Sequence, residues 1–211
     1  MGIDVSLRRG LDVVALDARA RLWLGPVKAE VGDLERLVAL ARPSVIAIDA
    51  PPAWAAAGRS RAAERRLLSL GLAIFATPQD PGSHPFYAWM RAGFEVFAAV
   101  ARLGYPLHRG GSARFPCAIE VFPHATAVVL RGSLPARGVP KRVWRRRVLE
   151  GAGVEHAPLR TLDELDAALA ALTGLHLLRG TACQAGEEGE AVLVLPGRRL
   201  PSRRFEREGP P

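Results

Sequence analysis

The chain has 211 residues, 49% of them hydrophobic and 24% charged, which suits one globular domain with a full core. No apolar run is long enough to span a membrane, no signal peptide is recognisable, and Cys117 and Cys183 are too few and too far apart for a zinc motif or a disulfide framework. We therefore expect a cytoplasmic protein. Its net charge of +8, carried almost entirely by arginine, either attracts phosphate or reflects a GC-rich genome.

The hydrophobic pattern predicts strands and helices along most of the chain. Gly10 lies between the first two strand-like runs and indicates an antiparallel hairpin, while Asp33 and Pro43 mark the start and the end of the first helix. The predicted strands cover residues 1–6, 11–17, 21–25, 44–49, 117–122 and 190–195. The predicted helices cover residues 33–42, 60–72, 85–103, 124–130, 141–151 and 161–174.

A hairpin followed by alternating helices and strands indicates an α/β fold, with a mixed sheet and helices on both faces. The continuously apolar run at 44–49 is typical of a buried parallel strand. We expect a single domain over residues 1–196 with a helical and loop insertion around 52–116, of which 77–116 could form a lid or a dimer surface. The Arg-, Pro- and Gly-rich residues 197–211 predict a flexible basic tail.

Acidic residues interrupt several apolar segments, where an isolated carboxylate is costly unless it is paired. Asp4 and Asp49 are expected near the ends of neighbouring strands, where ligand crevices open in α/β sheets. Asp163 and Asp166 are three residues apart and share a helix face. These oxygen ligands predict a site for Mg²⁺ or Mn²⁺ that activates water against a phosphodiester. The predicted catalytic residues are Asp4, Asp49, Glu120 and Asp166, and the predicted metal ligands are Asp4, Asp49, Asp166 and Asp163.

Each acidic residue also has a plainer explanation. Asp163 suits an exposed first helical turn, where the helix dipole favours a negative charge. Asp49 suits the turn that ends a strand, and Glu120 would be satisfied by a buried arginine. Asp4 is harder to explain without a ligand, because it interrupts the first core strand.

Several short segments form a pattern through their order and spacing. They are Gly2-Ile-Asp-Val-Ser6, Ala47-Ile-Asp-Ala-Pro51, Arg61 with Glu64-Arg65, Ile119-Glu-Val-Phe-Pro123, Lys141, Asp163-Glu-Leu-Asp-Ala167 and Gly189-Glu-Ala-Val-Leu-Val-Leu-Pro196. In these segments the chain resembles domain-of-unknown-function family 429, described as predicted nucleases with a ribonuclease-H-like fold. The resemblance covers roughly residues 1–196.

The resemblance implies a ribonuclease-H-like sheet whose first three strands are antiparallel. It also implies acidic metal ligands on the first strand, on the fourth strand and on a late helix. Here these ligands are Asp4, Asp49 and Asp166, with Asp163 as a helper. Glu120 would join this site or orient one of its ligands.

Basic residues gather on two of the predicted helices. Arg61 and Arg65 lie on the first, and Lys141 and Arg145 lie on the second, where Trp144 adds an aromatic ring. Such helices can hold a phosphate backbone and stack a base, so we predict that these four basic residues contact the substrate. A solvated helix face with one core tryptophan is the alternative.

The leading hypothesis is a metal-dependent nuclease, a hydrolase whose partner is DNA or RNA and which has no membrane partner. A non-catalytic nucleic-acid-binding module would carry the same basic charge and would use the carboxylates only for structure. A phosphotransferase of the actin-like fold is disfavoured, because no glycine-rich phosphate loop follows the first strand.

Overall fold

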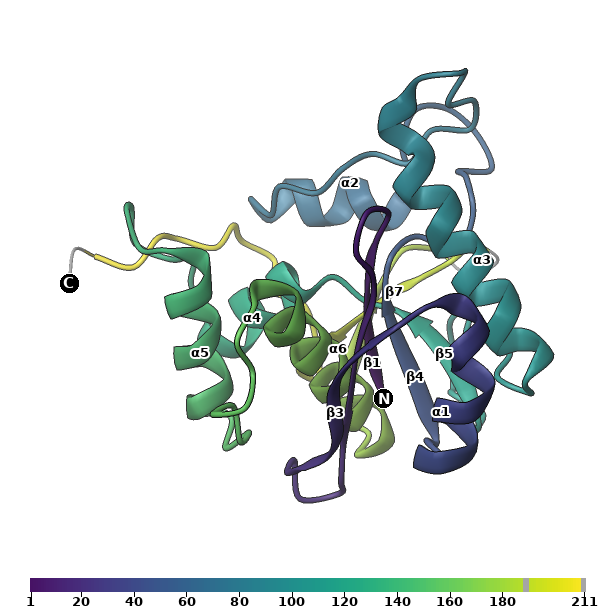
Figure 1. The fold of residues 1–211 in the computed structure, drawn as a ribbon. Helices are drawn as coiled ribbons and strands as arrows, with labels where there is room; N and C mark the ends of the chain where they lie inside the picture. The colour runs from purple at the N-terminus through teal and green to yellow at the C-terminus, as the bar shows by residue number, and fades with distance from the viewer. Residues whose placement is uncertain (188–189, 210–211) are drawn as a thin grey trace.

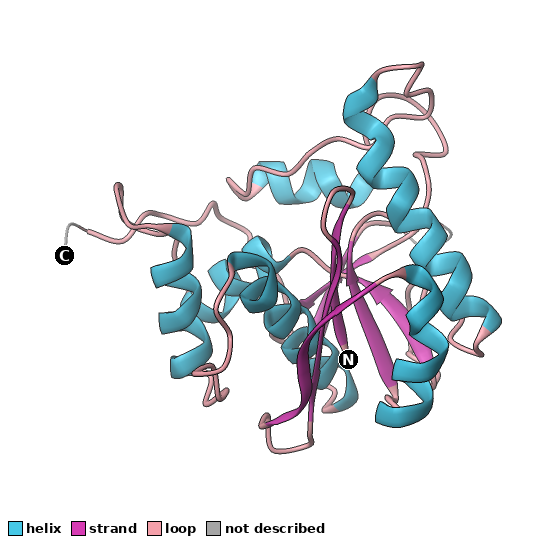
Figure 2. Ribbon diagram, viewed as in Figure 1, coloured by secondary structure: helices cyan, strands magenta, loops and turns pink. Residues whose placement is uncertain are grey.

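The computed structural model describes residues 1–187 and 190–209, which are built around one seven-stranded sheet (Figures 1 and 2). The strands lie side by side in the order β3-β2-β1-β4-β5-β7-β6. Their bounds are β1 Gly2–Ser6, β2 Gly10–Leu16, β3 Leu22–Ala29, β4 Val45–Asp49, β5 Cys117–Glu120, β6 Ala182–Ala185 and β7 Leu193–Pro196.

The sheet is mixed, as the sequence predicts. β1, β2 and β3 pair antiparallel, and β1, β4, β5 and β7 run parallel, so the predicted hairpin and the buried parallel strand at β4 are both confirmed. Gly10 begins β2 rather than lying in the turn, and its φ of +69° is one that glycine adopts without strain. β6 was not predicted; it pairs antiparallel with β7 at the sheet edge.

Helices cover both faces of the sheet, which confirms the predicted arrangement (Figure 2). Helices α1 and α3 pack on one face, and α4, α5 and α6 lie on the other, with α6 crossing β1, β2 and β4. The helices run over α1 Leu34–Ala41, α2 Ala62–Ser69, α3 Ala88–Arg102, α4 Pro123–Arg131, α5 Lys141–Gly151 and α6 Leu162–Leu178. None of the helices in the described residues combines the length and the apolar character needed to cross a membrane.

Helix α6 approaches β1 at backbone distance. A Cβ built on Gly2 would lie 2.0 Å from the backbone oxygen of Ala167 and 2.3 Å from the backbone nitrogen of Ala171. Only a residue without a side chain therefore fits at the start of β1. This contact fixes the distance between β1 and the first turns of α6, which carry Asp163 and Asp166.

The long connection from β4 to β5 holds α2, a short 3₁₀ turn at Pro85–Tyr87 and α3, as the predicted insertion requires. The segment after β7 packs on the domain as far as the described residues extend. The backbone of Phe205 bonds to Leu70, and the backbones of Glu206 and Glu208 bond to Leu134. These contacts attach the described part of the predicted basic tail, residues 197–209, to the domain. Its predicted flexibility stays a prediction, and residues 210–211 and Gly189 of the closing family segment lie outside the described residues.

Candidate metal centre

Three carboxylates face one another across the central strands. Asp4 on β1 is in register with Asp12 on β2 and with Asp49 on β4. Residues in register on neighbouring strands point to the same face, and this is the face that Gly2 presents to α6. Asp4 and Asp49 are therefore neighbours, as the sequence predicts.

The first turns of α6 bring two further carboxylates to this face. Thr161 caps the helix by accepting from the backbone N–H of Glu164, whose side chain accepts from the backbone of Thr161 in return. Asp163 and Asp166 lie within the first two turns, where the helix dipole favours negative charge.

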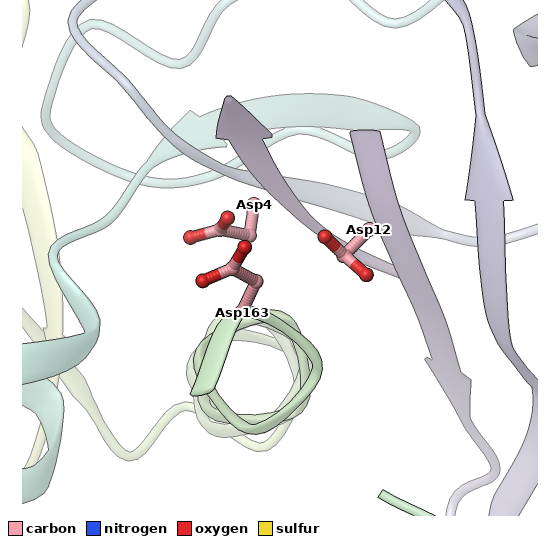
Figure 3. Close-up of side chains that lie close together, drawn as sticks. All are labelled: Asp4, Asp12 and Asp163. Atoms are coloured by element: carbon pink, nitrogen blue, oxygen red, sulfur yellow. The ribbon is translucent and has the colours of Figure 1, made fainter. Parts of the chain in front are cut away.

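The closest grouping is formed by Asp4, Asp12 and Asp163 (Figure 3). Each offers one carboxylate oxygen, and the three oxygens all lie within 4.8 Å of one another. Asp163 reaches up from α6 toward Asp4, while Asp12 approaches from β2 (Figure 3). We refer to Asp4, Asp12, Asp49, Asp163 and Asp166 together as the acidic cluster.

Burial and mutual repulsion make the ionised form of the carboxyl groups in the cluster unfavourable. Burial, followed by the charges of Asp166, Asp163 and Asp12, raises the pKa of Asp4 to about 8. Burial and then the charge of Asp4 also raise the pKa of Asp49 well above its usual range.

Basic side chains neutralise only part of this charge. Arg145 of α5 is buried and donates from Nε to Asp166 Oδ1 at 2.7 Å, although burial still raises the pKa of Asp166. Arg9 at the β1–β2 turn lies 2.8 Å from Asp163, and Lys28 pairs with Asp12 Oδ2. Both of these partners are at least half exposed, so solvent screens them.

Asp12 provides a test of whether a cation fits the cluster. Its side chain is 1% exposed, yet its Oδ1 has no hydrogen-bond partner among the described residues. A buried oxygen without a partner costs free energy that a coordinated cation would recover. The donor set consists of carboxylate oxygens, which Mg²⁺ and Mn²⁺ prefer. The residues therefore fit a hard divalent ion.

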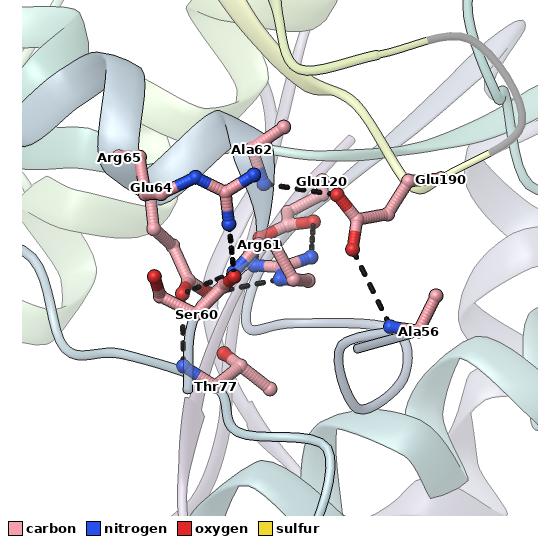
Figure 4. A network of polar contacts seen from close by, with 9 residues as sticks. All are labelled: Ala56, Ser60, Arg61, Ala62, Glu64, Arg65, Thr77, Glu120 and Glu190. Carbon is pink, nitrogen blue, oxygen red and sulfur yellow. Dashed lines mark hydrogen bonds and ion pairs between the residues drawn. The ribbon is translucent and has the colours of Figure 1, made fainter. Parts of the chain in front are cut away.

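Glu120 does not join the acidic cluster. It is in register with Ile48, one residue before Asp49, so its side chain leaves the opposite face of the sheet. Both of its oxygens accept from Arg61, at 2.6 Å each, and Arg61 Nε donates to Glu64 at 2.8 Å (Figure 4). The structure thus gives Glu120 the buried arginine partner that was the alternative to a role in the site.

The same network changes the expectation for Arg61. Its side chain is 2% exposed and its guanidinium is engaged by two carboxylates, so it does not present a free charge to a substrate. Glu64 also accepts from the backbone N–H groups of Arg61 and Thr77 (Figure 4). Arg61 therefore fastens α2 and the following loop to β5.

The other three predicted substrate contacts differ in burial and in their distance from the cluster. Arg145 is buried against Asp166 and also meets His124, Nη1 to Nδ1 at 3.3 Å, so it orients a carboxylate of the cluster. Lys141 is exposed at the start of α5, and its positive charge lowers the pKa of Asp166. Arg65 is exposed on α2 and donates to the backbone oxygen of Ser60. Lys141 is thus the predicted contact that lies at the edge of the cluster.

Asp12 is the member of the cluster that sequence reasoning missed. Its signal was present, because it interrupts the apolar run of β2 just as Asp4 interrupts β1. The predicted hairpin turn would have placed the two residues near each other, but only the register shows them to be directly opposed.

Comparison with known proteins assigns the family. No curated protein and no solved structure matches the chain. A family model with the description "Protein of unknown function (DUF429)" matches residues 2–190, a range that includes the whole acidic cluster. The chain therefore belongs to the DUF429 family of proteins of unknown function.

Proposed function

We propose that this protein is a nuclease that hydrolyses phosphodiester bonds of DNA or RNA with Mg²⁺ or Mn²⁺ held by the acidic cluster. The observation that carries the proposal is the convergence of Asp4, Asp12 and Asp163, whose carboxylates each place one oxygen within 4.8 Å of the others, together with the buried Asp12 Oδ1 that has no hydrogen-bond partner among the described residues. Carboxylates brought this close repel one another, and a divalent cation removes that cost.

Asp4, Asp12 and Asp163 would hold the cation, with Asp49 and Asp166 beside them. When bound there, such an ion stabilises negative charge on phosphodiester oxygens and favours ionisation of water. Burial raises the pKa of Asp4 to about 8, so its carboxyl can release or accept a proton near neutral pH. Arg145 keeps Asp166 in one orientation through its bond at 2.7 Å.

Charge at the margin of the cluster supports a polyanionic substrate. Arg9 at the β1–β2 turn pairs with Asp163, the charge of Lys141 on α5 lowers the pKa of Asp166, and the chain carries a net charge of +8. A phosphate backbone approaching the cluster would meet these cations first.

The proposal is tested by incubating the purified full chain and its Asp4→Asn variant with Mn²⁺ and single-stranded DNA, duplex DNA, RNA, an RNA–DNA hybrid or a four-way junction. We expect the wild type to cleave at least one substrate and Asp4→Asn to lose about 100-fold or more of that rate. Asp80→Asn is the matched control, because Asp80 is exposed, far from the cluster in sequence, and keeps an oxygen for the backbone N–H of Gly82.

Thermal unfolding establishes that Asp4→Asn remains folded. If neither protein cleaves, or if both cleave equally, the nuclease proposal is wrong. In that case salt-dependent binding of the same strands would leave a non-catalytic nucleic-acid-binding module.

A further inference from the structure

A second feature, a cavity, adjoins the acidic cluster and shares one residue with it. A cavity of about 410 Å³ opens between the ends of β1, β4 and β5, the loop after α2, and the start of α3. Asp49 belongs to both, since it also lines this cavity. The other walls are mainly aromatic and aliphatic, including Val5, Ile74, Phe75, Phe86, Trp89 and Phe122.

The aromatic rings that line the cavity remain partly exposed to solvent. Phe75 and Phe86 meet edge to face with centroids 5.1 Å apart, and Phe75 lies 6.2 Å from Trp89. Phe75 is nevertheless 63% exposed and Phe86 39% exposed. Large apolar side chains that line a concave site and remain open to solvent indicate a ligand with a flat or apolar face.

The charged groups that line the cavity favour an uncharged ligand over an anion. Arg61, the one basic side chain among the described residues that line it, is already engaged by Glu120 and Glu64. The described residues of the lining thus offer no free cation to a phosphate, and the carboxyl of Asp49 offers it no attraction. An anion belongs at the cluster, where a divalent ion would receive it, and a neutral ring belongs in the cavity.

From this arrangement we infer that the aromatic cavity takes an unpaired nucleobase of the strand whose phosphate lies at the acidic cluster. Stacking on aromatic rings suits any base, and a base inside a duplex cannot enter because its faces are covered by its neighbours. The inference rests on the proposed function and adds to it the substrate class, which is single-stranded nucleic acid or a locally unpaired segment.

The test is binding, not cleavage. The full chain is titrated with a short single strand that carries one fluorescent adenine analogue, and with the same strand in a duplex. Ca²⁺ replaces Mg²⁺ and Mn²⁺ as a hard cation for oxygen ligands, and a gel verifies that the strand stays intact. We expect the fluorescence of the analogue to change on stacking in the single strand, with weaker binding of the duplex.

Phe75→Ala removes the most exposed ring of the wall and should raise the Kd for the single strand about 5- to 100-fold. Phe75→Trp keeps an aromatic face and should preserve binding. Trp23→Ala is the matched control, because Trp23 is 67% exposed on β3 and lies outside the cavity. Thermal midpoints near that of the wild type show that each variant is folded.

Unchanged single-strand affinity in Phe75→Ala, or equal affinity for the duplex, would overturn the inference. Equally tight binding of the free nucleoside analogue would also overturn it, in favour of a small-molecule pocket. The two proposals fail separately. Stacking without cleavage by any metal removes the nuclease alone, whereas cleavage that is equal in wild type and Phe75→Ala, without stacking, removes the base pocket alone.

Discussion

Asp4 and Asp12 stand directly opposite each other on β1 and β2, with both side chains on the face that α6 covers. Like charges in such a cross-strand pair destabilise a sheet. Lys28 offsets one oxygen of Asp12, and the other has no partner among the described residues. The pairing of Asp4 with Asp12 is therefore unfavourable when no cation lies between them.

Asp12→Asn should weaken Mn²⁺ binding about tenfold or more, because the orphaned carboxylate oxygen becomes part of a neutral amide. Isothermal titration with Mn²⁺ measures the affinity. Asp17→Asn is the control, since Asp17 follows the same strand but pairs with Arg21 at the surface. Equal Mn²⁺ affinity in wild type and Asp12→Asn would mean that Asp12 is not a ligand.

The pH dependence of stability should reveal the raised pKa of Asp4. A carboxyl with a pKa of about 8 when folded keeps its proton after the unfolded chain has lost it, so its contribution to the free energy of unfolding falls as pH rises from about 4 to about 8. The buried amino group of Met1 and the ring of His124 act in the opposite direction, because burial lowers their pKa values. The contribution of Asp4 is therefore measured as the difference in stability between the wild type and an Asp4 variant at each pH.

In chelator, Asp4→Asn should match the wild type near about pH 4 and become more stable than it toward about pH 8, by a few degrees or more in Tm. Excess Mn²⁺ should reverse the order at the higher pH, because only the wild type retains the full ligand set. A Tm difference that does not vary with pH would contradict the burial of an unfavourable charge at Asp4.

Arg61→Met should be among the most destabilising single changes in the chain. It leaves Glu120 and Glu64 buried without their shared counter-charge, at a cost of about 3–5 kcal/mol in the free energy of unfolding. Denaturant titration measures this loss. Arg65→Met, on the exposed side of the same helix, should change stability by less than about 1 kcal/mol. Similar effects of the two changes would argue that the buried network contributes little.

Gly2→Ala should disturb both stability and metal binding. The added Cβ would meet the backbone of α6 at 2.0 Å, so the helix must move away from β1 at a cost of about 1–3 kcal/mol or more. Because α6 carries Asp163 and Asp166, the affinity for Mn²⁺ should fall as well. Gly151→Ala at the end of α5, where nothing lies within 4 Å, is the control for both measurements. Metal affinity that survives in Gly2→Ala would show that the cluster tolerates a displaced helix.

Much of the fold followed from local patterns in the sequence. All six predicted helices formed, and α5 has the predicted bounds Lys141–Gly151, because these segments carry their own hydrophobic periodicity and end signals. The strand β6 escaped notice because its residues, Ala-Cys-Gln-Ala, have little strand preference of their own. It is held by pairing with β7, a contact that depends on the assembled sheet.

The site was recovered only in part, for a related reason. Asp4 and Asp49 were paired correctly, since parallel neighbours end at the same edge of the sheet. Glu120 lies on the predicted strand, but its register directs the side chain away from the cluster and toward Arg61, which was the alternative for this residue. The packing of residues 197–209 likewise depends on backbone hydrogen bonds with Leu70 and Leu134, which are distant in the sequence and cannot be predicted from a local pattern.

Asp49 forms a common wall between the acidic cluster and the aromatic cavity. Any occupant of the cavity that alters the ionisation of this carboxyl must alter the affinity of the cluster for a cation. Thermodynamic linkage then requires the cation to alter the affinity for that occupant by the same factor. In a chain that binds both a cation and a base, as we propose, neither affinity has a single value until the occupancy of the other site is specified.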